Sequence, residues 1–514
     1  MTWPHPASSG PARCWQRPLA GRRTWGTEFE ATTLRRLIAA LLVALAAWSN
    51  LAAVAGESRH TAAIYPEAAS RPAAGVPIVL KPGPHLLLDE FLIESSSNLT
   101  RKVNVPARDP AIPNPIVTGK EDGCFQPYLT VVRDAASGRF RLWYGAHTED
   151  FNTGRSHIGY LESADGVRWI RPHRVLADPG PIQFGVSVID EGPGFPRPAE
   201  RFRFAWHLGG LRIATSPDGL AWTPLSTEVV LEHNHDINGI FWDPLRRRYL
   251  ATVSYYIAGT TWSGTRRVTR HSASGDLLHW TEPWFVLTPD DKRDEGETQF
   301  YAMDGYLARG ELIIGMVKVL RDDLKADPAP EPRDAYGIGY TTLAWTRDGE
   351  HWTRDREKFF DRHPRQGAWD HSHAWIDEQL LVGEEVFLYY GGYRSGHKVN
   401  RFEERQIGLV KMKRDRYVAR EAGSLEGSFR TPLVQFAATA MTLNVEAAEG
   451  EVTVQILDER DRPVRGFARK DCQPVSGDSL AKVVRWKKPL GALKGTPVRL
   501  EFFTKNARLF DFDL

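Results

Sequence analysis

Three acidic residues each stand shortly before a short strand pattern in a different part of the chain. They are Asp122 before residues 128–133, Asp236 before residues 239–242, and Glu297 before residues 301–307. Carboxylates that converge on one hollow repel each other, so one is held protonated as a general acid while another stays ionised. Cleavage of a glycosidic bond uses such a pair. The pattern predicts Glu297 as general acid, Asp236 as base or nucleophile, and Asp122 as a third carboxylate.

Polar and aromatic residues beside these acids form a predicted substrate-binding set. Its members are His235, Asn238, Trp242, Gln299, Asp370, His371 and His373. Two His-x-His pairs occur here, and on a strand both members of a pair face the same side. We expect them to bond sugar hydroxyls or the carboxylates, and we predict no metal and no cofactor; a metal site is the alternative. The competing interpretation of each acid is a turn cap or a strand-end hydrogen bond.

An internal repeat indicates how these residues are positioned. Four turns share one pattern, and they span Ser163 to Trp169, Ser216 to Trp222, Ser274 to Trp280, and Thr346 to Trp352. The Asp-Gly step makes a tight reversal, and we expect the tryptophan to return and pack between neighbouring sheets. Two strand patterns precede each copy, and a degenerate fifth copy ends near Asp415. A period of roughly fifty to seventy residues is typical of a propeller blade with its loop.

The repeat therefore predicts an all-β fold with a five-bladed propeller at residues 84–420, closed by the strand Pro84 to Glu94. After residue 421 the period ends, and short alternating strands predict a β-sandwich at 421–514. No long helical period follows the N-terminal region, which excludes nucleotide-binding α/β folds. Propellers bind ligands at the central hollow, where the innermost strands of the blades begin.

The N-terminal region predicts export. Arg35 and Arg36 precede the apolar run from Leu37 to Trp48, and Ala53-Val54-Ala55 supplies the small residues of a cleavage site. We predict a signal peptide at 1–55, a linker at 56–83, and a periplasmic or extracellular location. The apolar run is too short for a comfortable membrane span, so we expect no stable span in the mature chain.

Charge excludes one class of partner. The 514 residues include 66 basic and 64 acidic side chains, a net charge of +2, so no electrostatic argument favours nucleic acid. The many aromatic residues suit both short strands and sugar faces, and we predict a carbohydrate partner.

Three segments carry a resemblance to a known group of proteins. They are Leu86 to Ile93, Asp236 to Asp243, and the stretch from Gly466 to Asp478. With the repeat, they make the chain resemble the five-bladed propeller glycoside hydrolases of families 32, 43 and 68, and most of all bacterial family 32-like proteins. The motifs Trp-x-Asn-Asp-Pro-Asn-Gly and Glu-Cys of family 32 are absent, and Arg108-Asp109-Pro110 precedes the first blade. The family's catalytic triad is therefore not transferred to this chain.

The resemblance implies a glycoside hydrolase that acts on a poly- or oligosaccharide. One rival is a non-catalytic carbohydrate-binding propeller, which would not need two carboxylates at catalytic separation. A second rival is a protein-binding propeller that uses outer loops such as residues 322–333.

Overall fold

The computed structural model describes residues 71–514, except for 74, 119–123, 147–155, 174–175, 236, 260–263, 328–336 and 401–403; the side chains of residues 124–127 are also not described. The predicted signal peptide lies outside this range, as does most of the predicted linker. Within the described range, no helix is long and apolar enough to cross a bilayer.

Five antiparallel blades follow one another along the described chain, and a single parallel pairing of Gly339 with His373 joins the fourth and fifth into one seven-stranded sheet. The first contains β5 (Cys124–Arg133), β6 (Phe140–Ala146), β7 (His157–Ser163) and β8 (Trp169–Ile170), and the second contains β9 (Phe184–Asp190), β10 (Phe202–His207), β11 (Leu211–Ser216) and β12 (Thr223–Pro224). The third contains β13 (Asn238–Asp243), β14 (Arg248–Ala258), β15 (Thr265–Ser274) and β16 (Trp284–Leu287). The fourth contains β17 (Thr298–Arg309), β18 (Leu312–Arg321), β19 (Ile338–Thr346) and β20 (Thr353–Arg354), and the fifth contains β21 (His373–Val382), β22 (Glu385–Tyr393) and β23 (Gln406–Lys413).

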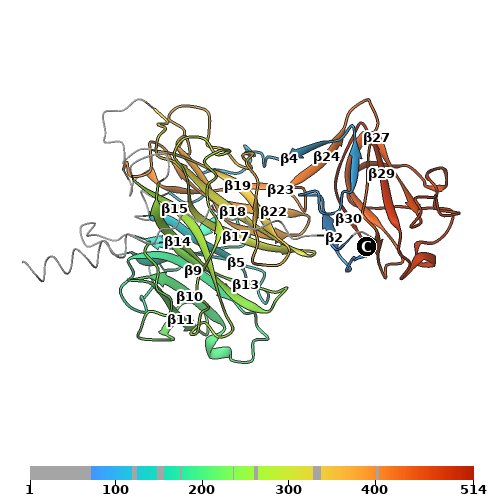
Figure 1. Cartoon of the computed structure of the whole chain (residues 1–514). Coiled ribbons are helices and arrows are strands. Elements are labelled where there is room, and N and C mark those ends of the chain that lie inside the picture. Colours follow the sequence, from blue (N-terminus) through green and yellow to red (C-terminus); the bar gives the residue numbers. More distant parts are fainter. Residues whose placement is uncertain are drawn as a thin grey trace, which may run out of the picture. The chain divides into compact units, whose positions relative to one another are not determined.

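The first strands of the five sheets form a closed ring. β5 contacts β9, β9 contacts β13, β13 contacts β17, β17 contacts β21, and β21 contacts β5 again. Several of these inner strands lie side by side in Figure 1. Radial repetition of small sheets around a channel is the propeller arrangement. The all-β, propeller-like fold predicted from the repeat is confirmed.

The repeated turns have the predicted chemistry. Ser163 Oγ accepts hydrogen bonds from the amides of Asp165 and Gly166, and Asp165 Oδ1 accepts from the two amides that follow. Gly166 has φ +75°, the left-handed region that favours glycine. The preceding blade bonds the turn, because Tyr389 Oη donates to the Gly166 carbonyl at 2.9 Å. Trp143 Nε1 likewise donates to the carbonyl of the next turn at 2.8 Å. The turns therefore fasten neighbouring blades to each other.

The four repeat tryptophans pack against the blade cores. Trp352 is 4% exposed, whereas Trp169, Trp222 and Trp280 are half-buried against hydrophobic clusters. The Trp352 ring meets His271 of the preceding blade at 5.5 Å, and the Trp169 ring meets Tyr389 at 6.1 Å. These two therefore pack between sheets as expected.

Closure of the ring differs from the prediction. Ala107 pairs with Lys411 and Val117 pairs with Ile407, so residues 107–117 complete the outer edge of the fifth sheet. β2 (Pro84–Leu86) instead pairs with β30 (Ala507–Asp513) in the C-terminal part of the chain. The predicted closing strand, Pro84 to Glu94, is wrong. An apolar run can pair with any open sheet edge, and its periodicity does not select which one.

The C-terminal module is a nine-stranded sheet. It contains β2, β3 (Ser95–Ser97), β4 (Thr100–Val103), β24 (Val418–Ala422), β25 (Gly427–Arg430), β27 (Thr442–Leu457), β28 (Val475–Val483), β29 (Arg499–Lys505) and β30. β1 (Ile78–Val79) and β26 (Val434–Gln435) form a separate parallel pair. Short 3₁₀ turns lie at Pro198–Glu200, Arg469–Asp471 and Leu490–Leu493. This sheet has its own hydrophobic core, which includes Leu443, Val454 and Phe502.

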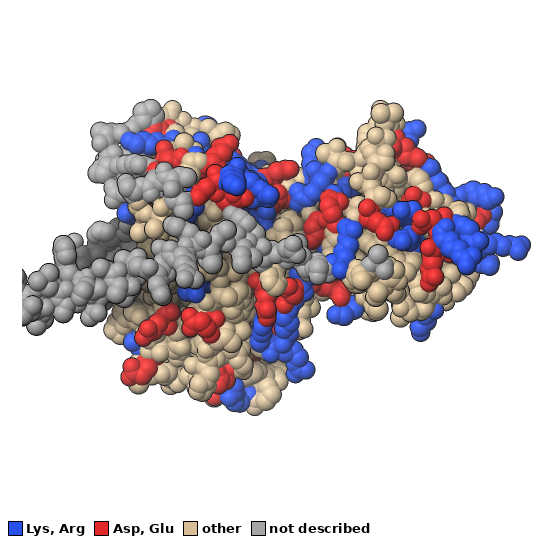
Figure 2. Space-filling model, in the orientation of Figure 1, with Lys and Arg blue, Asp and Glu red and all other residues tan. Residues whose placement is uncertain are grey.

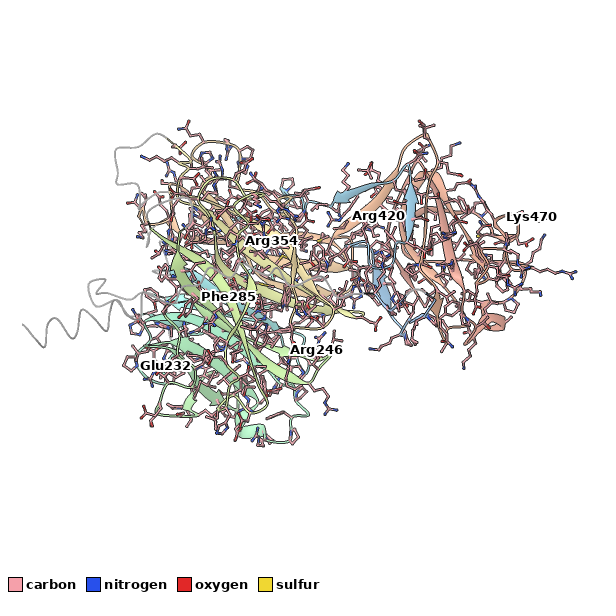
Figure 3. All side chains as sticks on the ribbon, in the orientation of Figure 1. Glu232, Arg246, Phe285, Arg354, Arg420 and Lys470 are labelled. Carbon is pink, nitrogen blue, oxygen red and sulfur yellow. The ribbon has the colours of Figure 1, made fainter. Side chains whose placement is uncertain are left out.

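The N-terminal strands of this module change the domain boundaries. Residues 84–103 belong to the C-terminal sheet by strand pairing, although the sequence placed them in the propeller. Within the module, Arg420, labelled in Figure 3, donates to Glu90 at 2.6 Å. Asp89 also accepts from Trp345 Nε1 of the fourth blade at 2.9 Å, so this segment contacts both cores.

Candidate functional site

Polar side chains gather where the inner strands of the third, fourth and fifth blades begin. The first step is a hairpin register: Thr298 of β17 pairs with Arg321 of β18. Glu297 directly precedes Thr298 and Asp322 directly follows Arg321, so the two residues are opposite each other just beyond the paired ends of the strands. Opposite residues of an antiparallel pair have Cβ atoms about 4.5–5.5 Å apart. Both residues are half-buried. The hairpin thus brings the predicted acid Glu297 beside a carboxylate that the sequence analysis did not select.

Asp322 belongs to a hydrogen-bonded network. Gln299 Nε2 donates to Asp322 Oδ2 at 2.8 Å, and Arg267 Nη1 donates to Gln299 Oε1 at 2.8 Å. Arg267 Nε also donates to His235 Nε2 at 3.3 Å, and its guanidinium lies 3.7 Å from Asp322 Oδ2. Arg267 therefore links the predicted residues Gln299 and His235 to Asp322. Asp322 in turn lies beside the predicted acid Glu297.

The environment of Asp322 favours its protonated form. Burial raises the pKa of the Asp322 carboxyl above its ordinary value, and the negative charge of Glu297 raises it further. Arg267, the Gln299 amide and Lys398 act in the opposite direction, but they do not cancel the rise. The surroundings of Asp322 therefore favour a proton on this carboxyl.

Aromatic rings close the inner side of the network. Tyr301 stacks on Trp375 with ring centroids 4.6 Å apart, and His397 meets Tyr301 edge-on at 5.0 Å. Tyr256 meets His235 edge-on at 4.3 Å. Tyr301 and Trp375 are only 4% and 2% exposed. Because these two rings are buried, they support the polar side chains and offer no open surface on which a sugar ring could stack.

Asn238 lies at the start of β13 among histidines. Its Nδ2 is 3.4 Å from His233 Nε2, and His233 Nε2 is 3.3 Å from His207 Nδ1. Asn238 is 4% exposed, and its side-chain oxygen has no hydrogen-bond partner among the described residues. A buried amide oxygen without a partner is available to a hydroxyl or amide donor.

The predicted residues of the fifth blade are held by protein partners. Asp370 is 1% exposed and accepts from Arg108 Nε at 3.0 Å and from Tyr390 Oη at 3.1 Å. His371 bonds the His363 carbonyl at 2.9 Å, and His373 bonds Ser372 Oγ at 2.7 Å. Burial lowers the pKa of His373 well below its ordinary value, so this ring is neutral. In the described structure Asp370 joins the fifth blade to the segment that contains Arg108, and the substrate-binding role predicted for it stays a prediction.

Two of the predicted catalytic residues cannot be placed. Asp122 and Asp236 both lie outside the described residues. Trp242 is described, but it lines the channel inside the ring of inner strands and packs edge-on against Tyr249 at 4.8 Å.

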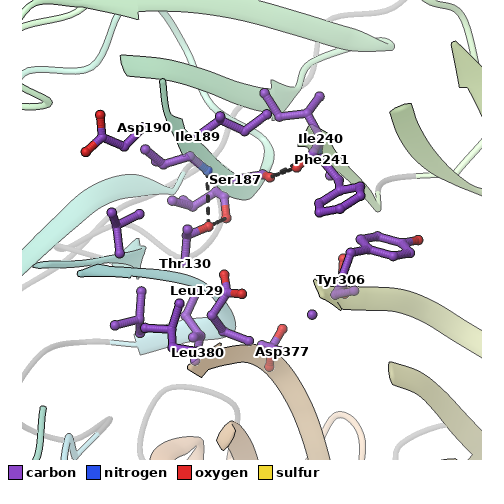
Figure 4. Close-up of a pocket in the computed structure, with 18 of the residues that line it drawn as sticks. Leu129, Thr130, Ser187, Ile189, Asp190, Ile240, Phe241, Tyr306, Asp377 and Leu380 are labelled. Carbon is purple, nitrogen blue, oxygen red and sulfur yellow. Dashed lines mark hydrogen bonds between the residues drawn. The ribbon is translucent and has the colours of Figure 1, made fainter. Parts of the chain in front are cut away.

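The channel contains a cavity of about 410 Å³ with its own charged residues. Asp304, Asp377 and Glu378 line it, and Figure 4 shows Asp377 beside Tyr306 and Leu380. Lys318 Nζ bonds Asp304 at 2.8 Å and also bonds Asp377. The sequence analysis missed this cluster. A single lysine within the otherwise apolar run from Leu312 to Leu320 was the available signal, because a buried lysine requires a carboxylate partner.

Metal and charge patterns add two observations. The described residues contain no group of three or more histidine, cysteine or acidic side chains arranged to hold a metal ion. On the face shown in Figure 2, basic and acidic side chains are interspersed, so the described surface there has no extended field of one sign.

Comparisons with known proteins give similarities of fold only. No protein-family model matches the chain, and a search of curated proteins returns no match. Among solved structures, a glycosyl hydrolase from Bacteroides ovatus is 15% identical with a TM-score of 0.39, covering 61% of this chain and 95% of that chain. A family 43 arabinoxylan arabinofuranohydrolase from Bacillus subtilis is 12% identical with a TM-score of 0.36, covering 77% and 98%. A β-1,2-mannobiose phosphorylase from Listeria innocua is 12% identical with a TM-score of 0.38, covering 62% and 97%. At such values the function must be argued from the residues of the site.

Proposed function

We propose that this protein is an exported glycoside hydrolase whose active site is the cluster at the inner-strand starts. The observation that carries the proposal is the pairing of Asp322, whose pKa is raised by burial, with the neighbouring carboxylate Glu297. Two carboxyl groups in different protonation states are what glycosidic bond cleavage uses. The substrate class is a poly- or oligosaccharide, and the C-terminal module is a β-sandwich appended to the propeller.

The roles follow from the environments of the two groups. Asp322 donates its proton to the glycosidic oxygen as the bond from that oxygen to the anomeric carbon breaks. Glu297 carries the negative charge that stabilises the positive charge developing on the sugar ring. A water molecule attacks the anomeric carbon, and a carboxylate accepts its proton; Asp236 and Asp122 are the further candidates for that base. Gln299 and Arg267 hold Asp322 in position.

This assignment modifies the role expected for Glu297. The sequence placed the general acid at Glu297 because it precedes an inner strand. The hairpin adds Asp322, whose raised pKa suits a proton donor.

The test uses the purified mature chain on a panel of polysaccharides, with release of reducing ends as the measurement. We expect Asp322→Asn to lower turnover by about 10²- to 10⁴-fold while KM changes little, as expected for loss of general acid catalysis. Glu297→Gln should also lower turnover. The matched control is Glu295→Gln in the same loop, where the side chain is 90% exposed, and its turnover should equal that of the wild type.

Two results would contradict the proposal. Full turnover in the Asp322→Asn variant would remove the proposed proton donor. Measurable sugar binding without any turnover by the wild type would instead identify a carbohydrate-binding propeller.

A further inference from the structure

The channel cavity contains a charged cluster that the proposed glycosidase site does not use. Asp304 comes from β17, Lys318 from β18, and Asp377 and Glu378 from β21. On β17 the cluster begins five residues after Gln299, and on β21 four residues after His373. At about 3.3 Å per residue, these separations correspond to about 13–16 Å along the channel. The two sets of residues are therefore spatially distinct.

A β-bulge turns two consecutive acids toward the same cavity. In the β21–β22 ladder, Ile376 pairs with Tyr390 and Glu378 pairs with Tyr389, so Asp377 is the extra residue between them. Successive side chains of a regular strand point to opposite faces, whereas at a bulge two consecutive residues oppose one residue of the partner strand, and Asp377 and Glu378 are both among the residues that line the cavity. Bulges re-aim side chains in this way and are frequent beside functional sites. A second register shift follows Asp304 in β17.

The cluster has more negative than positive groups. Three carboxyl groups surround one ammonium group, since Lys318 Nζ bonds only Asp304 and Asp377. Asp377 has a side chain that is 3% exposed, and its second oxygen, Oδ2, has no hydrogen-bond partner among the described residues. The nearby amide of Gly391 favours the ionised form without completing a bond to that oxygen. A buried carboxylate oxygen without a hydrogen-bond partner destabilises the folded protein unless a donor reaches it.

The electrostatics of the two acids show the same imbalance. Burial raises the pKa of Asp377 to about 7 and that of Glu378 to about 8, and the neighbouring carboxylates add to both rises. Near neutral pH the cluster therefore requires protons or another cation. The other titratable residues that line the described cavity are Tyr128, Arg133, Asp190, Asp304 and Tyr306. Lys318 bonds Asp304 and Asp377.

The remaining walls show what kind of cation fits. Leu129, Val131, Phe241 and Leu380 line the cavity together with the polar residues Thr130 and Ser187, and Asp304 Oδ1 faces Gly239, where a Cβ would lie 3.2 Å from it. A volume of about 410 Å³ is within the range of small-molecule sites, about 300–1,000 Å³. Calcium takes six to eight oxygen ligands, and the described residues contain no group of three or more acidic, histidine or cysteine side chains arranged to hold a metal ion. An ammonium group needs only two or three acceptors and can carry an apolar body.

We propose that the channel binds a small organic molecule with a protonated primary amine, whose ammonium group donates to Asp377 and Glu378. The body of the ligand lies along Phe241 and Leu380. An aliphatic amine and an amino sugar share this recognition chemistry. The site is independent of the proposed glycosidase chemistry, so either proposal can fail without the other.

The experiment is calorimetric titration of the purified chain with n-butylamine and with glucosamine, each compared with its neutral counterpart, n-butanol and glucose. We expect at least one amine to bind one molecule per chain and the neutral counterparts not to bind. Tighter binding of n-butylamine would identify an aliphatic amine site, and tighter binding of glucosamine an amino-sugar site. Glu378→Gln should weaken the binding about 10- to 100-fold, because it removes the carboxyl group that ionises to pair with the bound ammonium group.

Controls separate loss of the site from loss of folding. Glu385→Gln lies on the adjacent strand β22 with a side chain 48% exposed, and it should bind the amine like the wild type. The thermal midpoint of each variant is measured alongside, and Asp304→Asn serves as a second variant if Glu378→Gln unfolds. Equal binding of amine and neutral counterpart, binding of CaCl₂ but of neither amine, or no binding at all would each overturn the proposal.

Discussion

Replacement of Glu378 by glutamine should make the protein more stable at alkaline pH, although it removes a native charge. Burial raises the pKa of the Glu378 carboxyl from an ordinary value of 4.5 to about 8, and Asp304 and Asp377 add to the rise. The amides of Gln379 and Val131 favour the ionised form but do not compensate for burial. The folded state therefore holds a proton that the unfolded state has already released between about pH 4.5 and pH 8.

The sign follows from that difference in bound protons. Stability falls with rising pH wherever the folded state binds more protons than the unfolded state. The contribution of Glu378 is thus fully present below about pH 4.5 and is lost as the pH rises through about 8. The full displacement corresponds to about 5 kcal/mol at 1.36 kcal/mol per pKa unit. Because the side chain is only half-buried, solvent screening reduces this to about 2 kcal/mol.

The assay is urea unfolding of the wild type and of Glu378→Gln at pH 5, 7 and 9. At pH 5 the two free energies of unfolding should be similar, and at pH 9 the variant should be more stable by about 2 kcal/mol. Glu385→Gln on the neighbouring strand should follow the wild type at every pH. Parallel curves for wild type and Glu378→Gln, or a variant that is less stable at pH 9, would refute the assigned environment of Glu378.

Three further substitutions test the propeller. Arg108→Ala leaves the 1%-exposed Asp370 without its cation and should lower the free energy of unfolding by about 3–5 kcal/mol; the double variant with Asp370→Ala should recover part of the loss in the same urea assay. Gly166→Ala places a Cβ 2.6 Å from Tyr389 Oη at φ +75° and should lower the free energy of unfolding by about 1–3 kcal/mol, whereas Ala at Gly180, which has open space around its Cβ position and no left-handed φ, should have little effect. Trp352→Ala should lower it by about 3–5 kcal/mol, and a thermal midpoint equal to that of the wild type would contradict the packing role of this ring.

The repeated blades could be predicted from sequence because their information is local. Within each turn, Ser163 and its counterparts bond amides two or three residues away, so the hydrogen-bonding residues appear together in the sequence. Ring closure could not be predicted in the same way. It depends on which open sheet edge the apolar residues 84–88 pair with. Contacts with residues hundreds of positions away in the sequence determine that edge, such as the pairing of His85 with Phe512.

The candidate site was predictable only in part, for a related reason. Glu297 and Gln299 could be selected because they flank the start of an inner strand. Asp322 is at the far end of the next strand, and it meets Glu297 only through the register of the β17–β18 hairpin. Asp377 and Glu378 are still harder to predict, because a regular strand would send them to opposite faces and only the bulge brings both into the channel.

Charge pairing distinguishes structural acids from the acids proposed to do chemistry. Asp370 bonds Arg108, Asp190 bonds Arg201 and Asp415 bonds Arg309, so each of these buried carboxylates has a dedicated cation. Asp322 has only a looser ion pair, with Arg267 at 3.7 Å, and Glu378 has no ion pair among the described residues; the pKa of each is raised.

A raised pKa alone is not sufficient evidence for a functional acid. Burial also raises the pKa of Asp511 well above its ordinary value, but Asp511 lies in the C-terminal sheet, where β30 pairs with β27, and its partner is the Asn444 amide. Asp511 also has neighbouring carboxylates, Asp415 and Asp513. What distinguishes Asp322 is instead its place in a hydrogen-bonded polar network at the inner-strand starts, and what distinguishes Glu378 is a cavity in front of it. Each therefore combines an unfavourable charge with a place where a ligand can relieve it, which is the physical condition for binding or proton transfer.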